Sequence, residues 1–147
     1  MRPRILYLNV ENLFDTGILR AMVLKPAILI AGSLGAEVGF TSLYRRSETN
    51  RASQDFAYPV LEARRSERGF SIENVFLHIA FSLKVIWFAR NYDILHCRSY
   101  MATTIGLLCK LVLGKKVIFD VRGYLVDEAI ESGRIGPYGL KARLLRR

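Results

Sequence analysis

The feature that most constrains the fold of this chain is the alternation of short apolar runs with longer segments of helical periodicity. The short runs are rich in β-branched and aromatic residues and have the length of strands; they span residues 5–10, 38–44, 58–61, 93–97 and 117–120. Helical spacing marks residues 18–36, 71–90 and 100–113. This alternation predicts a Rossmann-like α/β fold, with an open, mainly parallel sheet, helices on both faces and right-handed crossovers.

Composition also suggests where individual strands lie in the sheet. The run Ile5–Val10 is apolar except for Asn9 and is expected at the centre. Pro59 cannot donate a backbone hydrogen bond, so the run 58–61 is expected at an edge. The run 117–119 is expected to be a strand buried on both faces.

The helical segments carry their own start and stop signals. Gly35 and Gly114 are expected to end the first and third segments, and Pro26 to kink the first or begin its second part. The predicted apolar faces comprise Leu19, Met22, Val23, Ile30 and Leu34 in the first segment, and Val75, Leu77, Ile79, Leu83, Ile86 and Trp87 in the second. The apolar stretches 21–36 and 70–89 contain charged residues. We therefore interpret both as core helices rather than membrane spans, and leave open the contact of one with a membrane surface.

Length and charge limit the classes of partner. The chain has 147 residues, enough for one domain, and a net charge of +9. This charge favours nucleotide phosphates, anionic lipid headgroups or nucleic acid. The basic residues are dispersed over connections and no nucleic-acid-binding motif occurs, so nucleic acid is not expected. The two cysteines, Cys97 and Cys109, are expected to be buried free thiols in a reducing cytoplasm.

Several common catalytic motifs do not occur in the sequence. It contains no GxGxxG dinucleotide fingerprint, no Walker motif and no GxSxG nucleophile elbow. His78 and His96 are isolated, whereas metal sites need three or four ligands. No metal ion or other cofactor is therefore expected.

The candidate site lies where two strands end. After the run 117–119 come Asp120, Arg122 and Gly123, and then Asp127 and Glu128. Arg98 and Ser99 follow the run 93–97 in the same way, directly before a helix that begins at Tyr100. If these strands are neighbours, two guanidinium groups and the free amides of a helix end face one crevice suited to a phosphate.

A purely structural interpretation of the same residues stays open. Arg98 could pair with Asp120, and Arg122 with Asp127 or Glu128, since ion pairs of this kind are common on loops. Gly123 could simply make a turn.

Three segments resemble a known family. They are FDVRGYLVDE at 119–128, HCRSYMATTIG at 96–106, and the opening unit formed by ILYLNV at 5–10 and GAEVGFTSLY at 35–44. Together they are similar to the N-terminal domain of family-four retaining glycosyltransferases, which have the GT-B fold. Many members of that family carry His where this sequence has Arg122, so the sequence departs from the family pattern at a position that bears on contact with the donor sugar.

The resemblance implies sugar transfer from a nucleotide sugar to a glycan or a lipid-linked acceptor. By the same resemblance, Asn12, Asp15 and Gly17 in the first loop would face the donor phosphates. Arg98 and Ser99 would border the cleft, Arg122 and Gly123 would approach donor or acceptor, and Asp127 and Glu128 would line the acceptor side.

The resemblance also sets expectations for the whole protein. Residues 1–147 would be the acceptor-side, Rossmann-like half of a GT-B enzyme, apparently truncated, and inactive without a donor-binding domain or chain. Two alternatives stay open: a non-catalytic accessory subunit, and a basic peripheral membrane protein that binds anionic lipid. The expected location is cytoplasmic, with contact at the inner face of the membrane as an option.

Overall fold

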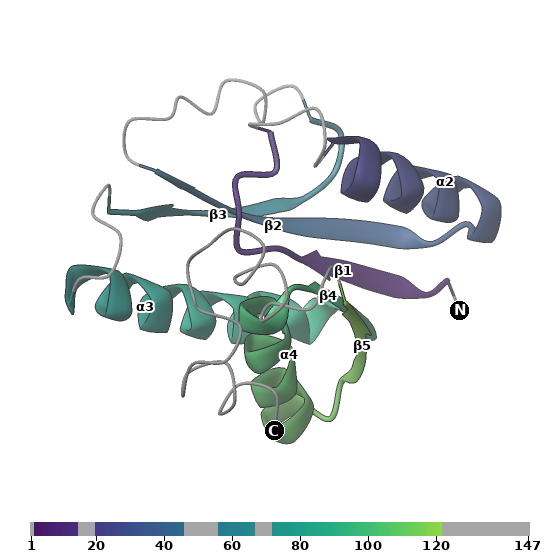
Figure 1. The fold of residues 1–147 in the computed structure, drawn as a ribbon. Coiled ribbons are helices and arrows are strands. Elements are labelled where there is room, and N and C mark those ends of the chain that lie inside the picture. The colour runs from purple at the N-terminus through teal and green to yellow at the C-terminus, as the bar shows by residue number, and fades with distance from the viewer. Residues whose placement is uncertain (1, 15–19, 46–55, 67–71, 122–147) are drawn as a thin grey trace, which may run out of the picture.

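The structure, a computed structural model, describes residues 2–14, 20–45, 56–66 and 72–121 (Figure 1). It contains five strands: β1 (Arg4–Leu8), β2 (Glu37–Arg45), β3 (Val60–Arg65), β4 (Ile94–Arg98) and β5 (Lys116–Asp120). Every pairing among them is parallel, and their order is β3-β2-β1-β4-β5. The Rossmann-like α/β fold is therefore confirmed, as are the central position of β1 and the edge position of β3.

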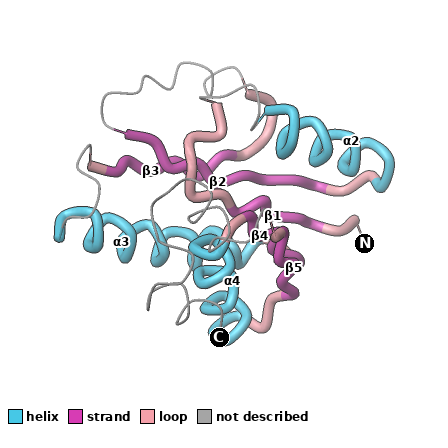
Figure 2. Tube along the Cα trace, viewed as in Figure 1, coloured by secondary structure: helices cyan, strands magenta, loops and turns pink. Residues whose placement is uncertain are grey.

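The helices lie on both faces of this sheet, as expected (Figure 2). Helix α2 (Lys25–Leu34) follows a short π-helical turn, η1 (Arg20–Leu24), and covers one face. Helices α3 (Ile72–Phe88) and α4 (Tyr100–Leu113) cover the other face, and a 3₁₀ turn, η3 (Ala89–Asn91), follows α3.

The helix boundaries follow the predicted signals. Pro26 lies in the first turn of α2, so it begins a helix rather than kinking one. Gly35 and Gly114 adopt left-handed backbone angles, with φ of 59° and 66°. Their amides bond to the carbonyl oxygens of Ala31 and Lys110, which is the usual way for a glycine to end a helix.

Alternation along the strands builds two separate cores. Ile5 and Tyr7 of β1 point toward α2, while Leu6 and Leu8 point toward α3 and α4. The α2 core also contains Val38, Phe40, Ala27 and Ala31; the other contains Leu95, Cys97, Phe81, Val85, Ala102, Ile105 and Cys109. Both cysteines are buried and free, as predicted.

The prediction that β5 is buried on both faces is wrong. Ile118 is 50% exposed and Phe119 is 38% exposed. Within the described residues, β5 has a strand neighbour on one side only, and α2 does not reach across to it. Apolar composition alone cannot distinguish such an edge strand from a central one.

The predicted apolar faces of two helices are also wrong in part. In the first segment, Val23 of η1 is buried as expected, but Met22 of η1 and both Ile30 and Leu34 of α2 are exposed. In α3, the buried residues are Phe81 and Val85. The residues expected to face the core that are instead exposed are Val75, Ile79, Leu83 and Trp87. As predicted, helix α3 contributes to the core, through Phe81 and Val85, but its most apolar window is only 22% buried, so only one side of this helix belongs to the core.

Candidate functional site

The strand order creates a switch point between β1 and β4. From β1 the chain moves outward to β2 and β3, and it then returns to β4 on the other side of β1. The loops that leave β1 and β4 therefore diverge and leave a crevice at the carboxyl ends of the strands, where open α/β sheets bind ligands. Asn9 follows β1 at this point, and Ser99 follows β4.

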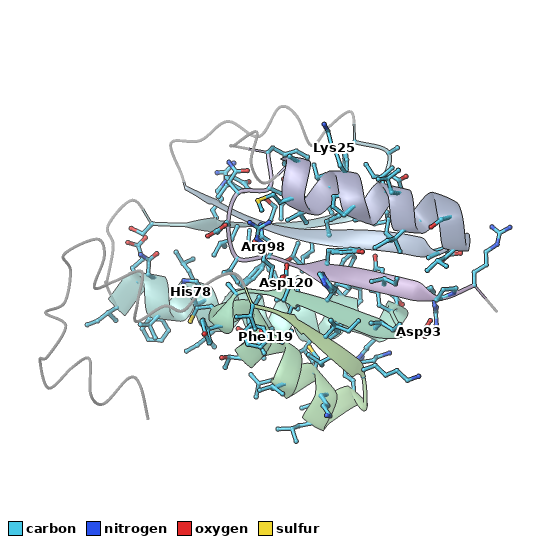
Figure 3. The ribbon with its side chains drawn as sticks, turned by 45° about the vertical axis from the view of Figure 1, so that its right-hand side comes forward. Lys25, His78, Asp93, Arg98, Phe119 and Asp120 are labelled. Carbon is cyan, nitrogen blue, oxygen red and sulfur yellow. The ribbon has the colours of Figure 1, made fainter. Side chains whose placement is uncertain are left out.

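Arg98 and Asp120 lie side by side at this edge. Each is the last residue of its strand, and their Cα atoms are register partners (Figure 3). The predicted crevice required the strands that end at Arg98 and Asp120 to be neighbours, and β4 and β5 are neighbours in the sheet. Arg98 and Asp120 each interact with other groups of the protein. The purely structural interpretation of this arginine therefore stays open beside the ligand-binding one.

A cavity of about 570 Å³ opens beneath these residues, on the α2 side of the sheet. Its volume falls within the usual range for small-molecule sites, roughly 300–1,000 Å³. The strands contribute Ile5, Tyr7, Leu8, Ile94 and Ile118 to its lining, and the helical side contributes Met22, Val23, Pro26, Ile30 and Leu34. The side chains of Met22 and Leu34 that the predicted helix face placed in the core thus form a wall of this cavity.

The cavity has a polar end and an apolar end. Its polar lining residues are Asn9, His96, Arg98 and Asp120, at or near the carboxyl ends of the strands. The apolar end contains Ile5 and Ile94, which are register partners near the amino ends of β1 and β4, and Leu34, which is the last residue of α2. A ligand with an ionic head and an apolar body would match this arrangement.

Aromatic packing shapes the middle of the cavity. The ring of Tyr7 stacks on Phe40, with centroids 5.5 Å apart, and meets the ring of His96 edge-on at 4.9 Å. Burial raises the pKa of Tyr7 above its ordinary value. Like an ordinary tyrosine, Tyr7 is neutral at pH 7, and its hydroxyl can donate a hydrogen bond.

Ser99 has a strained backbone at the mouth of the crevice. Its φ is 83° and its ψ is 161°, a region that is populated almost only by glycine. Its carbonyl oxygen accepts hydrogen bonds from the backbone amide of Thr103, at 3.0 Å, and from the hydroxyl of Thr103, at 2.8 Å. The hydroxyl of Ser99 does not cap α4, and its oxygen is buried with no hydrogen-bond partner among the described residues.

The first loop is held against β2 by buried hydroxyls. The backbone amide of Asn9 donates to Thr41 Oγ1 at 2.8 Å, and that hydroxyl donates back to the carbonyl oxygen of Asn9 at 2.8 Å. The amide of Leu13 donates to Ser42 Oγ at 3.1 Å. Asn12 is buried, and its side-chain oxygen accepts the amide of Phe14 at 3.1 Å, which forms a local turn. The described part of this loop is therefore fixed in place before any ligand arrives.

The predicted site residues are only partly covered by the described segments. Asn12, Arg98 and Ser99 lie at the carboxyl-end edge, where they were expected. Asp15, Gly17, Arg122, Gly123, Asp127 and Glu128 lie outside the described residues, so their roles stay predictions.

Two polar residues of the lining, Asn9 and His96, were not among the predicted site residues. Asn9 had been taken as the one polar position of a central strand, and His96 as an isolated histidine. A signal for both was present: they alternate with core residues, so that Tyr7 and Asn9 share a face of β1, and His96 and Arg98 share a face of β4.

The remaining groups near the site do not include a cysteine nucleophile or, among the described residues, a cluster of metal ligands. Cys97 points to the opposite face, and burial, with a smaller effect from Cys109, raises its pKa to about 12, so it is not a thiolate nucleophile at pH 7. In the described segments, no three His, Cys, Asp or Glu side chains lie together in a way that could hold a metal ion. The polar end of the cavity therefore combines the guanidinium of Arg98 with the carboxylate of Asp120 and the hydrogen-bonding side chains of Asn9 and His96.

The comparisons with known proteins add no relatives: no family model and no curated protein matches this chain. The resemblance to glycosyltransferases therefore stays a hypothesis that rests on the sequence segments given above.

Proposed function

We propose that this chain is the acceptor-side half of a retaining glycosyltransferase and binds a phosphate-bearing substrate at the switch point. The observation that carries the proposal is the position of Arg98. It ends β4 beside the crevice, and it lies at the polar end of a 570 Å³ cavity. Sugar transfer from a nucleotide sugar develops negative charge on the leaving diphosphate, and an arginine with backbone amides can stabilise that charge.

The surroundings of Arg98 support this chemistry. Helix α4 is 14 residues long and begins at Tyr100, so its first amide groups lie at the same edge of the sheet. The buried hydroxyl of Ser99 is a further hydrogen-bonding group at that edge. The carboxylate of Asp120 is adjacent to Arg98. It would hold the guanidinium in place or accept a hydrogen bond from a sugar hydroxyl.

The lining of the cavity favours a lipid-linked acceptor over a free glycan. Most of its lining side chains are apolar, and the ionic groups are confined to one end. A prenyl or acyl phosphate has the same division between head and tail. A free glycan would leave the apolar walls in contact with water or with its own hydroxyl groups, which is unfavourable.

Binding titrations of the purified chain test the proposal. The ligands are a uridine diphosphate sugar, a guanosine diphosphate sugar and farnesyl phosphate, with inorganic phosphate and farnesol as comparisons. We expect Arg98→Ala to weaken binding of the phosphate-bearing ligands by roughly ten-fold or more, because a charge-assisted hydrogen bond contributes about 1.5–3 kcal/mol. Arg98→Lys should recover only part of this loss, since a lysine cannot bind phosphate in a bidentate manner.

The matched control is Arg90→Ala, which removes the same charge in η3, the turn that follows α3, near the amino ends of the strands. It should leave these affinities unchanged. Equal losses for Arg90→Ala and Arg98→Ala would show a general effect of charge rather than a site. The proposal would be overturned if none of the sugar nucleotides or prenyl phosphates bound to a wild-type chain whose circular dichroism shows it to be folded.

A further inference from the structure

The outer surface of helices α3 and α4 is apolar, which is the reverse of what an ordinary surface helix shows. On α3 the exposed apolar residues are Ile72, Val75, Phe76, Ile79, Leu83 and Trp87, and on α4 they are Met101, Leu107, Leu108, Leu111 and Val112. We call these residues the outer apolar surface. Both helices cover the same face of the sheet and contact each other (Figure 1).

Helical geometry shows that this exposure is systematic. Phe76, Ile79 and Leu83 recur at spacings of three and four residues, so they form one stripe. Phe81 and Val85, which are buried against the sheet, lie on the opposite side of α3. The same division holds in α4, where Ala102, Ile105 and Cys109 are buried and Leu107 and Leu111 are exposed.

From these observations we propose that the outer apolar surface docks on a bilayer that contains anionic lipid. The segment Ile72–Asn91 is long and apolar enough to cross a membrane, yet Phe81 and Val85 hold it against the sheet. It therefore lies on the membrane rather than crossing it. Such interfacial helices insert an apolar face into the boundary between headgroups and acyl chains.

The charges beside this surface identify the lipid chemistry. Lys84, Arg90 and Lys110 are exposed on α3, η3 and α4, and the exposed Lys116 begins β5. Glu73 is the one acidic residue within α3 and α4. The whole chain carries a net charge of +9. Basic groups next to an apolar helix face attract anionic headgroups and add to the binding that apolar burial provides.

Trp87 offers a direct measurement, because it is the one tryptophan in the sequence and its side chain is 67% exposed on this surface. The wild-type chain would be mixed with vesicles of phosphatidylcholine alone or with about one-third phosphatidylglycerol. We expect co-sedimentation with the anionic vesicles, a blue shift of Trp87 emission and quenching by brominated acyl chains. Binding should weaken at about 1 M salt, where charges are screened within about 3 Å.

A pair of variants locates the surface. The double change Phe76→Glu with Leu83→Glu should reduce the vesicle partition coefficient by more than about ten-fold, since two apolar side chains are lost from the interface. The matched control is Leu29→Glu on α2, on the opposite face of the sheet, where the replaced leucine is 72% exposed. It should bind as the wild type does.

Several outcomes would overturn the proposal. They are the absence of sedimentation with anionic vesicles, sedimentation without any change in Trp87 emission, or equal binding by the double variant. A fourth is a dimer in lipid-free solution that the double variant dissociates, which would identify a second copy of the chain as the occupant. None of these results depends on the proposed transferase activity, because no sugar substrate is present.

Discussion

At the scale of single residues, Ser99 is the position where local preference and observed conformation disagree most. Its backbone angles lie in a region that costs a residue other than glycine on the order of 1–3 kcal/mol. Its buried hydroxyl has no hydrogen-bond partner among the described residues. Strain of this kind persists where the surroundings enforce it and is common at ligand sites. Here the surroundings are the end of β4 and the first turn of α4.

A comparison of two substitutions tests the strain at Ser99. Both Ser99→Gly and Ser99→Ala remove the hydroxyl, but only glycine relieves the backbone. Allowing about 0.5–1 kcal/mol for the greater freedom of glycine in the unfolded chain, we expect the glycine variant to be more stable by about 1 kcal/mol. Urea unfolding measures the difference. Equal stability, or a more stable alanine variant, would show that the strain is absent.

Asp93 carries the second prediction at this scale. Its carboxylate accepts the backbone amide of Arg4 at 3.0 Å and the guanidinium of Arg4 at 3.2 Å. The side-chain hydrogen bond from Arg4, followed by the backbone one, lowers the pKa of Asp93 below its ordinary value of 3.8. A pKa that is lower in the folded state means that the ionised form favours folding. The contribution is therefore present above pH 3.8 and disappears as the pH falls through the lowered pKa.

Asp93→Asn should accordingly destabilise the protein at pH 7, and the gap from wild type should close toward about pH 2. The urea midpoint measured across this range gives the comparison. Glu73→Gln removes one carboxylate from α3 and controls for net charge. A gap that stays constant with pH would contradict the role assigned to the ionised carboxylate.

At the scale of elements, two glycines with opposite surroundings predict opposite effects. A Cβ at Gly39 in β2 would overlap the hydroxyl of Tyr92 and lie 2.9 Å from its Cε1 atom. That ring is buried and packs on Phe88, with centroids 5.3 Å apart, so it cannot move freely. Gly32 in α2 has nothing within 4 Å of such a Cβ.

Gly39→Ala should therefore lower the free energy of unfolding by about 1–3 kcal/mol through overpacking. Gly32→Ala should raise it by up to about 1 kcal/mol, because alanine favours a helix more than glycine does. Thermal and urea unfolding of both variants provide the test. A neutral Gly39→Ala would mean that Tyr92 can shift to accommodate the methyl group.

Most strands and helix ends could be predicted from the sequence, because apolar runs and helix-ending residues are local signals. Gly35, Gly114 and Pro26 mark helix ends where the structure has them. The buried side of α3 could not be predicted, since Val75, Ile79, Leu83 and Trp87 are as apolar as Phe81 and Val85. Periodicity identifies a face only where polar residues mark the opposite one.

The candidate site could be predicted in the same partial way. The ends of β4 and β5 were expected to meet, because abrupt polar residues after apolar runs are local features. The lining by Asn9 and His96 depends on which face of each strand α2 covers. Alternation shows which residues of a strand share a face, but the face that α2 covers is set by packing between segments distant in sequence, which local patterns do not reveal.

At the scale of the whole molecule, the two sheet faces are covered unequally. Among the described elements, α2 and the short turn η1 before it cover one face, whereas α3 and α4 share the other. The cavity occupies the thinly covered face, and the outer apolar surface lies on the far side of the sheet. The proposed substrate site and the proposed membrane surface are therefore separated by the sheet and can be altered independently.

The wall that α2 gives to the cavity has a fixed length. From Pro26 to Leu34 there are eight residue-to-residue steps along α2, which at about 1.5 Å each is roughly 12 Å. A hydrocarbon tail whose charged end is held near Arg98 would run along this wall toward Leu34. The length of α2 would then limit the tail that the cavity accommodates: a short tail would contact this wall over its whole length, and each carbon beyond the last turn of α2 would be exposed to solvent.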